Sequence, residues 1–186
     1  MGMPAHQTEW TAEMARALPD DGKRYEVLDG ELFVSPAPRL DHQAVVLHLA
    51  VRLEAYVRTH KLGWLFVSPA DIEFSPHTLV QPDLFVVPDT GKGRPRSWHE
   101  IRQLLLVVEV LSHSTARVDR TEKRTTYQRE RIPDYWIVDA DGRVVERWCV
   151  ADDRPEVLAD SLTWRPRADV PALEIDLVEF FVAALD

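Results

Sequence analysis

The sequence contains a single cysteine, Cys149, among 186 residues. One cysteine excludes an internal disulfide and is typical of proteins that fold in a reducing compartment, so we expect a cytoplasmic location. Long apolar runs are also missing. No segment approaches the roughly 20 apolar residues of a membrane-spanning helix, so we expect no membrane partner. Glu9 and Glu13 stand where a secretory signal would have a basic head and an apolar centre.

Positive charge is scarce. The formal net charge of −9 argues against a nucleic-acid partner, because contacts with phosphates need Lys and Arg. The charge is unevenly distributed, however: residues 92–131 hold ten Lys and Arg but only five Asp and Glu. This basic segment could contact phosphates, and it could equally be a solvated helix face, so both interpretations stay open.

The composition suits one soluble domain. Hydrophobic residues make up 45% of the chain and charged residues 28%, and the length allows a substantial core. We expect a single domain over residues 1–186, with a core at about 24–150 and a C-terminal extension at 151–186.

The middle of the chain predicts a strand, a helix and a second strand. Residues 104–111 form a short apolar run rich in valine, which is typical of a strand buried on both faces. Residues 115–131 predict a charged helix that ends before Pro133, and residues 135–138 predict another strand. Two strands joined by a helix are expected to be parallel, with a right-handed crossover.

The flanking segments complete an α/β fold with a mixed sheet. An N-terminal helix is expected from Thr8 to Leu18, capped by Thr8 or Thr11, and Asp29-Gly30 predicts a hairpin turn. Pro82 cannot donate to a strand ladder, so it predicts an edge or an irregularity. The other expected elements are strands at 24–28, 31–34, 64–74, 79–87 and 144–150, a helix at 41–60, one or two edge strands at 157–158 and 173–175, and a final helix from about residue 176.

Glu109 is the residue that points to a function. It interrupts the apolar run at 104–111, where an ionised carboxylate costs several kcal/mol unless a cation pairs with it. Asp83 follows Pro82 on a neighbouring expected strand. Asp83 could instead be a turn-forming aspartate, and Glu109 could form a plain buried ion pair with Lys123.

If Asp83 and Glu109 converge, they favour a divalent metal. Two carboxylates about 4 Å apart repel by roughly 4 kcal/mol at an effective dielectric constant near 20. A divalent ion would remove this repulsion, and oxygen ligands suit Mg²⁺ or Mn²⁺ better than Zn²⁺. Such an ion can polarise a phosphoryl oxygen, and Lys123 could orient or activate the attacking water.

Helical spacing brings further residues toward this group. Asp119, Lys123 and Tyr127 recur every four residues, so they line one face of the expected helix. His42 lies near the start of another helix, where it could reach the site or simply act as a capping or surface residue. We take His42, Asp119, Tyr127 and Arg124 as candidates for substrate contacts.

Several separated motifs resemble one known family. The segments Val80-Gln81-Pro82-Asp83-Leu84 and Leu106-Val107-Val108-Glu109-Val110-Leu111-Ser112, with Asp119 four residues before Lys123, resemble the PD-(D/E)XK nuclease superfamily and its Uma2 family of restriction-endonuclease-like proteins. The similarity covers about residues 24–150. It implies a restriction-endonuclease-like central mixed sheet flanked by helices, an N-terminal hairpin and helix, and phosphodiester cleavage with a divalent metal.

The resemblance also implies roles for individual residues. Asp83 and Glu109 match the two metal-binding acids, the main-chain carbonyl of Val110 would be a third ligand, and Glu31 matches an acidic residue from early in the fold. The sequence departs from the usual pattern at Leu111, where the superfamily has a lysine. Lys123 would replace that lysine from the next helix.

We therefore expect a DNA endonuclease that uses Mg²⁺ or Mn²⁺, with Glu31, Asp83, Glu109 and Lys123 in catalytic roles. Exposed hairpin edges favour a homodimer or a higher homo-oligomer. Two alternatives remain: a non-catalytic nucleic-acid or protein binding module on a nuclease fold, and a hydrolase of small phosphoesters.

Overall fold

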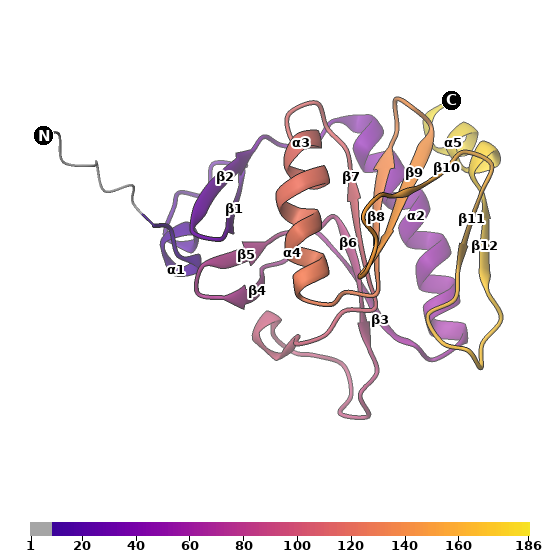
Figure 1. Cartoon of the computed structure of the whole chain (residues 1–186), viewed down its shortest axis with the longest axis horizontal. Helices are drawn as coiled ribbons and strands as arrows, with labels where there is room; N and C mark the ends of the chain where they lie inside the picture. Colours follow the sequence, from indigo (N-terminus) through magenta and orange to yellow (C-terminus); the bar gives the residue numbers. More distant parts are fainter. Residues whose placement is uncertain (1–8) are drawn as a thin grey trace, which may run out of the picture.

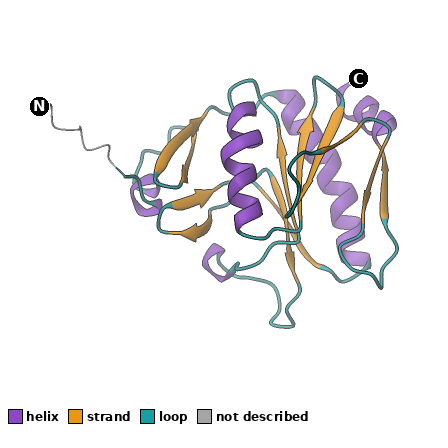
Figure 2. Ribbon diagram, viewed as in Figure 1, coloured by secondary structure: helices purple, strands orange, loops and turns teal. Residues whose placement is uncertain are grey.

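Three β-sheets and five α-helices make up the computed structural model, which describes residues 9–186 (Figures 1 and 2). The largest sheet has six strands in the order β10-β9-β8-β7-β6-β3. A four-stranded sheet in the order β2-β1-β5-β4 lies beside it, and β11 and β12 form a two-stranded sheet. The expected α/β class with mixed sheets is confirmed.

The six-stranded sheet is mixed, as expected. Strands β7 and β8 are parallel, and all other neighbouring pairs are antiparallel. The helical segment between β7 and β8 makes the predicted crossover. The strands are β3 (Gly63–Val67), β6 (Leu84–Pro88), β7 (Leu106–Val110), β8 (Asp134–Asp139), β9 (Val144–Cys149) and β10 (Glu156–Leu158). A 3-10 helix, η1 (Trp98–Glu100), lies between β6 and β7.

The N-terminal part of the chain forms the four-stranded sheet. Strands β1 (Arg24–Leu28) and β2 (Glu31–Ser35) pair around Asp29-Gly30. Both turn residues have positive φ, 50° and 82°, as a two-residue hairpin turn requires, so the predicted hairpin is confirmed. Helix α1 (Ala12–Arg16) packs on this sheet and is capped by Thr11, one of the two predicted caps; Thr8 lies outside the described residues.

Two of the predicted strands are each divided between two sheets. The segment expected at 64–74 forms β3 and then β4 (Ile72–Ser75), and the segment expected at 79–87 forms β5 (Thr78–Val80) and then β6. The continuous strands were therefore wrong predictions. Pro69 and Pro82, which have no amide hydrogen to donate, lie in the two breaks. The irregularity predicted at Pro82 is confirmed as the point where the chain passes from one sheet to the other.

Helices cover both faces of the six-stranded sheet (Figure 1). Along β7, Leu106, Val108 and Val110 belong to the apolar cluster that contains helix α2 (Leu40–Thr59). Val107 instead joins the cluster on the other face, which contains Tyr127 of helix α4 (Arg124–Arg129). Because side chains alternate along a strand, Glu109 shares the face of Val107 and lies toward the helix that carries Lys123.

The C-terminal segment packs on the α2 side of the sheet. Strands β11 (Ser161–Trp164) and β12 (Leu173–Asp176) pair with each other, and helix α5 (Leu177–Leu185) begins at the expected position, with Asp176 accepting a hydrogen bond from the Glu179 amide at 2.9 Å. Strand β11 was not among the elements expected from the sequence. None of the helices in residues 9–186 is long and apolar enough to cross a membrane.

Trp164 connects this C-terminal segment to the core. It is 1% exposed, and its ring lies 5.9 Å from that of Trp136 in β8 and 5.6 Å from that of Tyr56 in α2. We predict that Trp164→Ala lowers the free energy of unfolding by about 3–5 kcal/mol, because it leaves a large cavity. Val178→Ala, on an exposed position of α5, should change it little. Denaturant unfolding should remain a single transition, and separate unfolding of residues 151–186 would contradict the expected single domain.

Candidate active site

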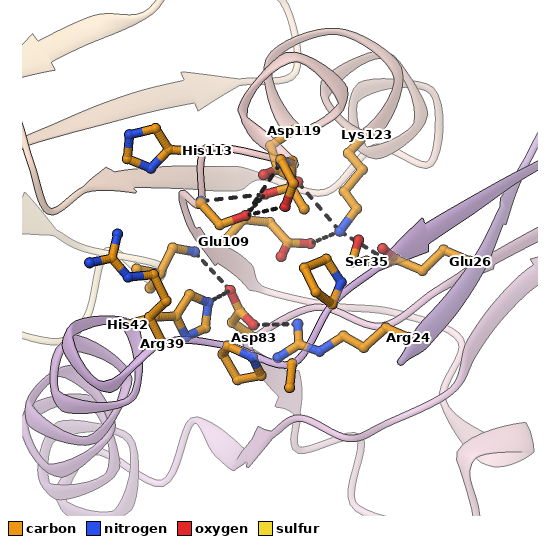
Figure 3. Close-up of a pocket in the computed structure, with 17 residues that line it drawn as sticks. Arg24, Glu26, Ser35, Arg39, His42, Asp83, Glu109, His113, Asp119 and Lys123 are labelled. Carbon is orange, nitrogen blue, oxygen red and sulfur yellow. Dashed lines mark hydrogen bonds and ion pairs between the residues drawn. The ribbon is translucent and has the colours of Figure 1, made fainter. Parts of the chain in front are cut away.

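Asp83 and Glu109 lie together because β6 and β7 are antiparallel. Leu84 at the start of β6 pairs with Val108, so Asp83 lies beside the carboxyl end of β7. The Val110 amide donates a hydrogen bond to Asp83 Oδ2 at 2.9 Å. Both acidic residues are 2% exposed and line one pocket of about 380 Å³ (Figure 3).

Asp83 is held by three donors. Besides the Val110 amide, Oδ2 contacts His42 Nε2 at 2.9 Å, and Oδ1 accepts from Arg24 Nη1 at 2.6 Å. Burial acts to raise the pKa of the Asp83 carboxyl. The hydrogen bond and charge of His42, together with Arg24, outweigh this effect and lower the pKa from 3.8 to about 2. Asp83 is therefore ionised at neutral pH.

Lys123 lies among three carboxylates from different elements. Its Nζ is 3.0 Å from Glu109 Oε1, 3.0 Å from Glu26 Oε1 and 3.4 Å from Asp119 Oδ1. Burial acts to lower the pKa of the ammonium group, but Glu109, Glu26 and Asp119 raise it well above its usual value. Lys123 is therefore a permanent cation at neutral pH, suited to orienting and stabilising negative charge and unsuited to removing a proton.

The pKa of Glu109 is shifted in the opposite direction from that of Asp83. Burial raises the pKa of its carboxyl group well above the usual value, and the negative charges of Asp83, Asp119 and Glu26 raise it further, although Lys123 opposes them. Tyr127 donates a hydrogen bond from its hydroxyl to Glu109 Oε1 at 3.0 Å. Both this bond and that of Lys123 fall on Oε1, so Glu109 Oε2 makes no hydrogen bond within the described part of the chain.

A π-helical turn, η2, supplies two members of this cluster. Helix α3 (Ala116–Val118) continues through η2 (Asp119–Lys123) into α4. Asp119 and Lys123, the first and last residues of the wide turn, are both buried. The sequence analysis predicted an uninterrupted helix whose face carries these two residues. The structure confirms that Asp119 and Lys123 share a buried face, but the helix is interrupted by the π-turn. A π-turn is an irregularity that often occurs at functional sites.

Glu26 occupies the place for which the sequence analysis chose Glu31. Glu31 pairs with Leu28 at the turn end of the β1–β2 hairpin, is exposed and does not line the pocket. Glu26, two residues from Leu28 and on the same strand face, is 2% exposed and accepts the Gln81 amide at 2.7 Å. The role given to Glu31 is therefore corrected. The two-residue spacing of Arg24, Glu26 and Leu28 places all three on one strand face, and this spacing could have indicated that Glu26 faces the interior.

The four candidates for substrate contacts divide into two pairs. His42 and Asp119 line the pocket, whereas Tyr127 and Arg124 do not. Tyr127 is fully buried, so it can only position Glu109. Arg124 stacks over the Trp148 ring at 4.9 Å, because a helical residue directly after Lys123 is rotated by about 100° from it. The structure therefore does not place Tyr127 or Arg124 for contact with a substrate bound in this pocket.

The mouth of the pocket is formed by residues 35–39, after the hairpin, and 112–115, after β7. These segments contribute four hydroxyl groups and two exposed basic or titratable side chains (Figure 3). They are Ser35, Arg39, Ser112, His113, Ser114 and Thr115. The hydroxyl groups and the exposed Arg39 can donate hydrogen bonds to an anionic substrate.

The donor atoms fit a hard divalent cation held by few protein ligands. In residues 9–186, no three His, Cys, Asp or Glu side chains are grouped as a metal site. Mg²⁺, however, commonly binds one or two carboxylates and keeps several waters. Glu109 Oε2 is available, and the Val110 carbonyl points to the same strand edge as its amide, toward Asp83. Four buried acids surround two permanent cations, Arg24 and Lys123, so added positive charge would be favourable.

We predict that Asp83 contributes to acid stability. Because its folded pKa of about 2 lies below the ordinary 3.8, its contribution is present above pH 4 and is lost as the pH falls toward 2. Asp83→Asn should remove about 2 kcal/mol of this contribution. Urea unfolding from pH 6 to pH 2 should show the wild type and the variant converging, whereas exposed Asp153→Asn should follow the wild type throughout. A constant difference across this range would contradict the prediction.

Comparisons with known proteins identify a family and a shared fold. The Uma2 family model, described as "Putative restriction endonuclease", matches residues 12–178. A crystal structure from Anabaena variabilis, described as "a putative nuclease belonging to DUF820", has 18% identity and a TM-score of 0.74, and the match covers 94% of this chain and 99% of that one. This likeness shows the shared fold. No curated protein matches the chain. The family match covers most of the sequence, and the chain belongs to the Uma2 family.

Proposed function

We propose that this protein is an endonuclease that hydrolyses DNA phosphodiester bonds with Mg²⁺ or Mn²⁺. The observation that carries the proposal is the pocket in which Asp83, directly before β6, and Glu109 of β7 meet Lys123 from the following helix. Membership of a family with the description "Putative restriction endonuclease" supports the reaction class.

Asp83, Glu109 and the Val110 carbonyl would hold the metal. When bound, the ion would polarise a phosphoryl oxygen of the substrate and lower the pKa of a coordinated water. Asp83 is suited to this because it is already ionised, and Glu109 because its Oε2 is available within the described residues. Tyr127 and Lys123 orient the Glu109 carboxylate through its other oxygen.

Lys123 would stabilise the negative charge that develops on the phosphate and orient the attacking water. It fills the role that the superfamily gives to the lysine at the position of Leu111. Its position is secured by Glu26, whose Oε1 also accepts the Gln81 amide two residues before Asp83. Preorganised charges of this kind need little rearrangement in the transition state, which is why they are effective.

We predict that supercoiled plasmid is nicked with Mg²⁺ or Mn²⁺ and that Asp83→Asn, Glu109→Gln and Lys123→Met reduce nicking to background. Glu26→Gln should reduce the rate by about 10–100-fold, the range typical of outer-shell partners in metal sites, because Glu26 positions Lys123. Glu31→Gln is the matched control and should retain full activity, since Glu31 is exposed outside the pocket. Equal nicking by all variants would indicate a contaminant and contradict the proposal.

Two further measurements, alongside the plasmid assay, separate the alternative functions. Hydrolysis of a chromogenic phosphodiester without any cut in DNA would identify a small-phosphoester hydrolase. Salt-sensitive DNA binding that does not depend on metal or on Lys123 would identify a binding module.

Metal binding can be tested without a substrate. A ligand at about 100 times its Kd stabilises the folded protein by about 2.7 kcal/mol, so Mn²⁺ should raise the Tm of the wild type by several degrees. This rise should disappear in Asp83→Asn and persist in Glu31→Gln. An equal rise in Asp83→Asn would exclude this site as the metal site.

A further inference from the structure

Both carboxylate oxygens of Asp83 accept hydrogen bonds in the free protein. Oδ2 has two donors, His42 and the Val110 amide, which lie among buried atoms of the core. Oδ1 has one, the guanidinium of Arg24, at 2.6 Å. A metal that binds Asp83 must therefore share Oδ1 with Arg24 or displace it.

Sharing is unfavourable. The metal and the Arg24 guanidinium are both cations, and a divalent ion repels a neighbouring cation twice as strongly as a monovalent ion does at the same distance. We propose that Arg24 occupies the metal-binding oxygen of Asp83 in the free protein, and that it exchanges this carboxylate for a substrate phosphate when the metal binds. The inference rests on the proposed nuclease function and adds a phosphate-binding residue to it.

Arg24 is free to make this exchange. Its side chain is 20% exposed, whereas that of Asp83 is 3% exposed, and it reaches the pocket from β1, outside the six-stranded sheet (Figure 3). It makes one hydrogen bond, through Nη1, among the described residues. A guanidinium has five N–H donors, so most of its donors are available, and its planar fork matches a phosphate as well as a carboxylate.

The surrounding charges make a phosphate the natural new partner. Glu26 and Glu109, the other acids near Arg24, already share Lys123. The phosphodiester would enter through a mouth lined with hydroxyl groups, and its negative charge would arrive together with the added positive charge of the metal. Arg24 would then balance the phosphate directly, as arginine does in many phosphate sites.

The test compares Mn²⁺ affinity with DNA cleavage in the same variants. Calorimetric titration with Mn²⁺ alone should show about tenfold tighter binding by Arg24→Gln than by the wild type, because a competing cation is gone. At saturating Mn²⁺, the same variant should cleave plasmid about a hundredfold more slowly, because the phosphate has lost its partner. A structural role for Arg24 would weaken both properties together.

Two further variants complete the test. Arg39→Gln removes the same charge from the mouth, where Arg39 makes no ion pair with a described residue, so its Mn²⁺ affinity should stay within about twofold of the wild type. Arg24→Lys keeps a charge but loses the fork, so it should bind Mn²⁺ at least as well as the wild type and cleave more slowly. It also serves if Arg24→Gln does not fold.

The outcomes distinguish this inference from the proposed function. If the wild type neither binds Mn²⁺ nor cleaves DNA, the proposed function fails. If the wild type does both, the inference about Arg24 is overturned by Mn²⁺ binding in Arg24→Gln that is no tighter than in the wild type, or by wild-type cleavage in Arg24→Lys.

Discussion

Burial of four carboxylates in one pocket is the constraint on which the arrangement of this protein depends. Ionised groups removed from water destabilise a fold by several kcal/mol each unless opposite charges lie beside them. Strand β1 meets this requirement with two residues on one face: Arg24 pairs with Asp83, and Glu26 pairs with Lys123. The N-terminal hairpin therefore supplies the charges that let the six-stranded sheet and the helix after β7 hold their polar groups in a buried site.

The site also depends on two departures from regular backbone. At residues 81–83 the chain passes from the four-stranded sheet to the six-stranded sheet. Here the Gln81 amide donates a hydrogen bond to Glu26 Oε1 instead of to a neighbouring strand. At η2 the helix widens, and Asp119 and Lys123 both turn inward. Regular structure at either point would satisfy the backbone equally well, but it would present these side chains differently. The irregular segments thus position function-bearing groups on an otherwise regular framework.

Local patterns were sufficient for most of the elements. Apolar runs predicted the strands of the βαβ unit, apolar residues at helical spacing predicted α2, and Pro133 predicted the end of the charged helix between the two strands. Asp29-Gly30 predicted the hairpin because few residues tolerate its positive φ values. The patterns were insufficient where one apolar run serves two sheets, as at 64–74 and 79–87. β-Propensity records how well a residue fits a pleated surface, and it contains no information on which sheet receives it. Strand β11 was missed because its exposed and buried residues alternate over only four positions.

The candidate site was likewise predictable from local patterns only in part. That Asp83, Glu109 and Lys123 are unusual follows from the chain itself, since charges within apolar or patterned segments stand out wherever the elements finally pack. The choice of Glu26 over Glu31, the contact of Arg24 with Asp83, and the absence of Tyr127 and Arg124 from the pocket lining arise only in the folded molecule. Periods of 2 and 3.6 residues determine which face of an element a side chain occupies. The distance between two elements depends on how their surfaces pack, which contacts far apart in sequence decide.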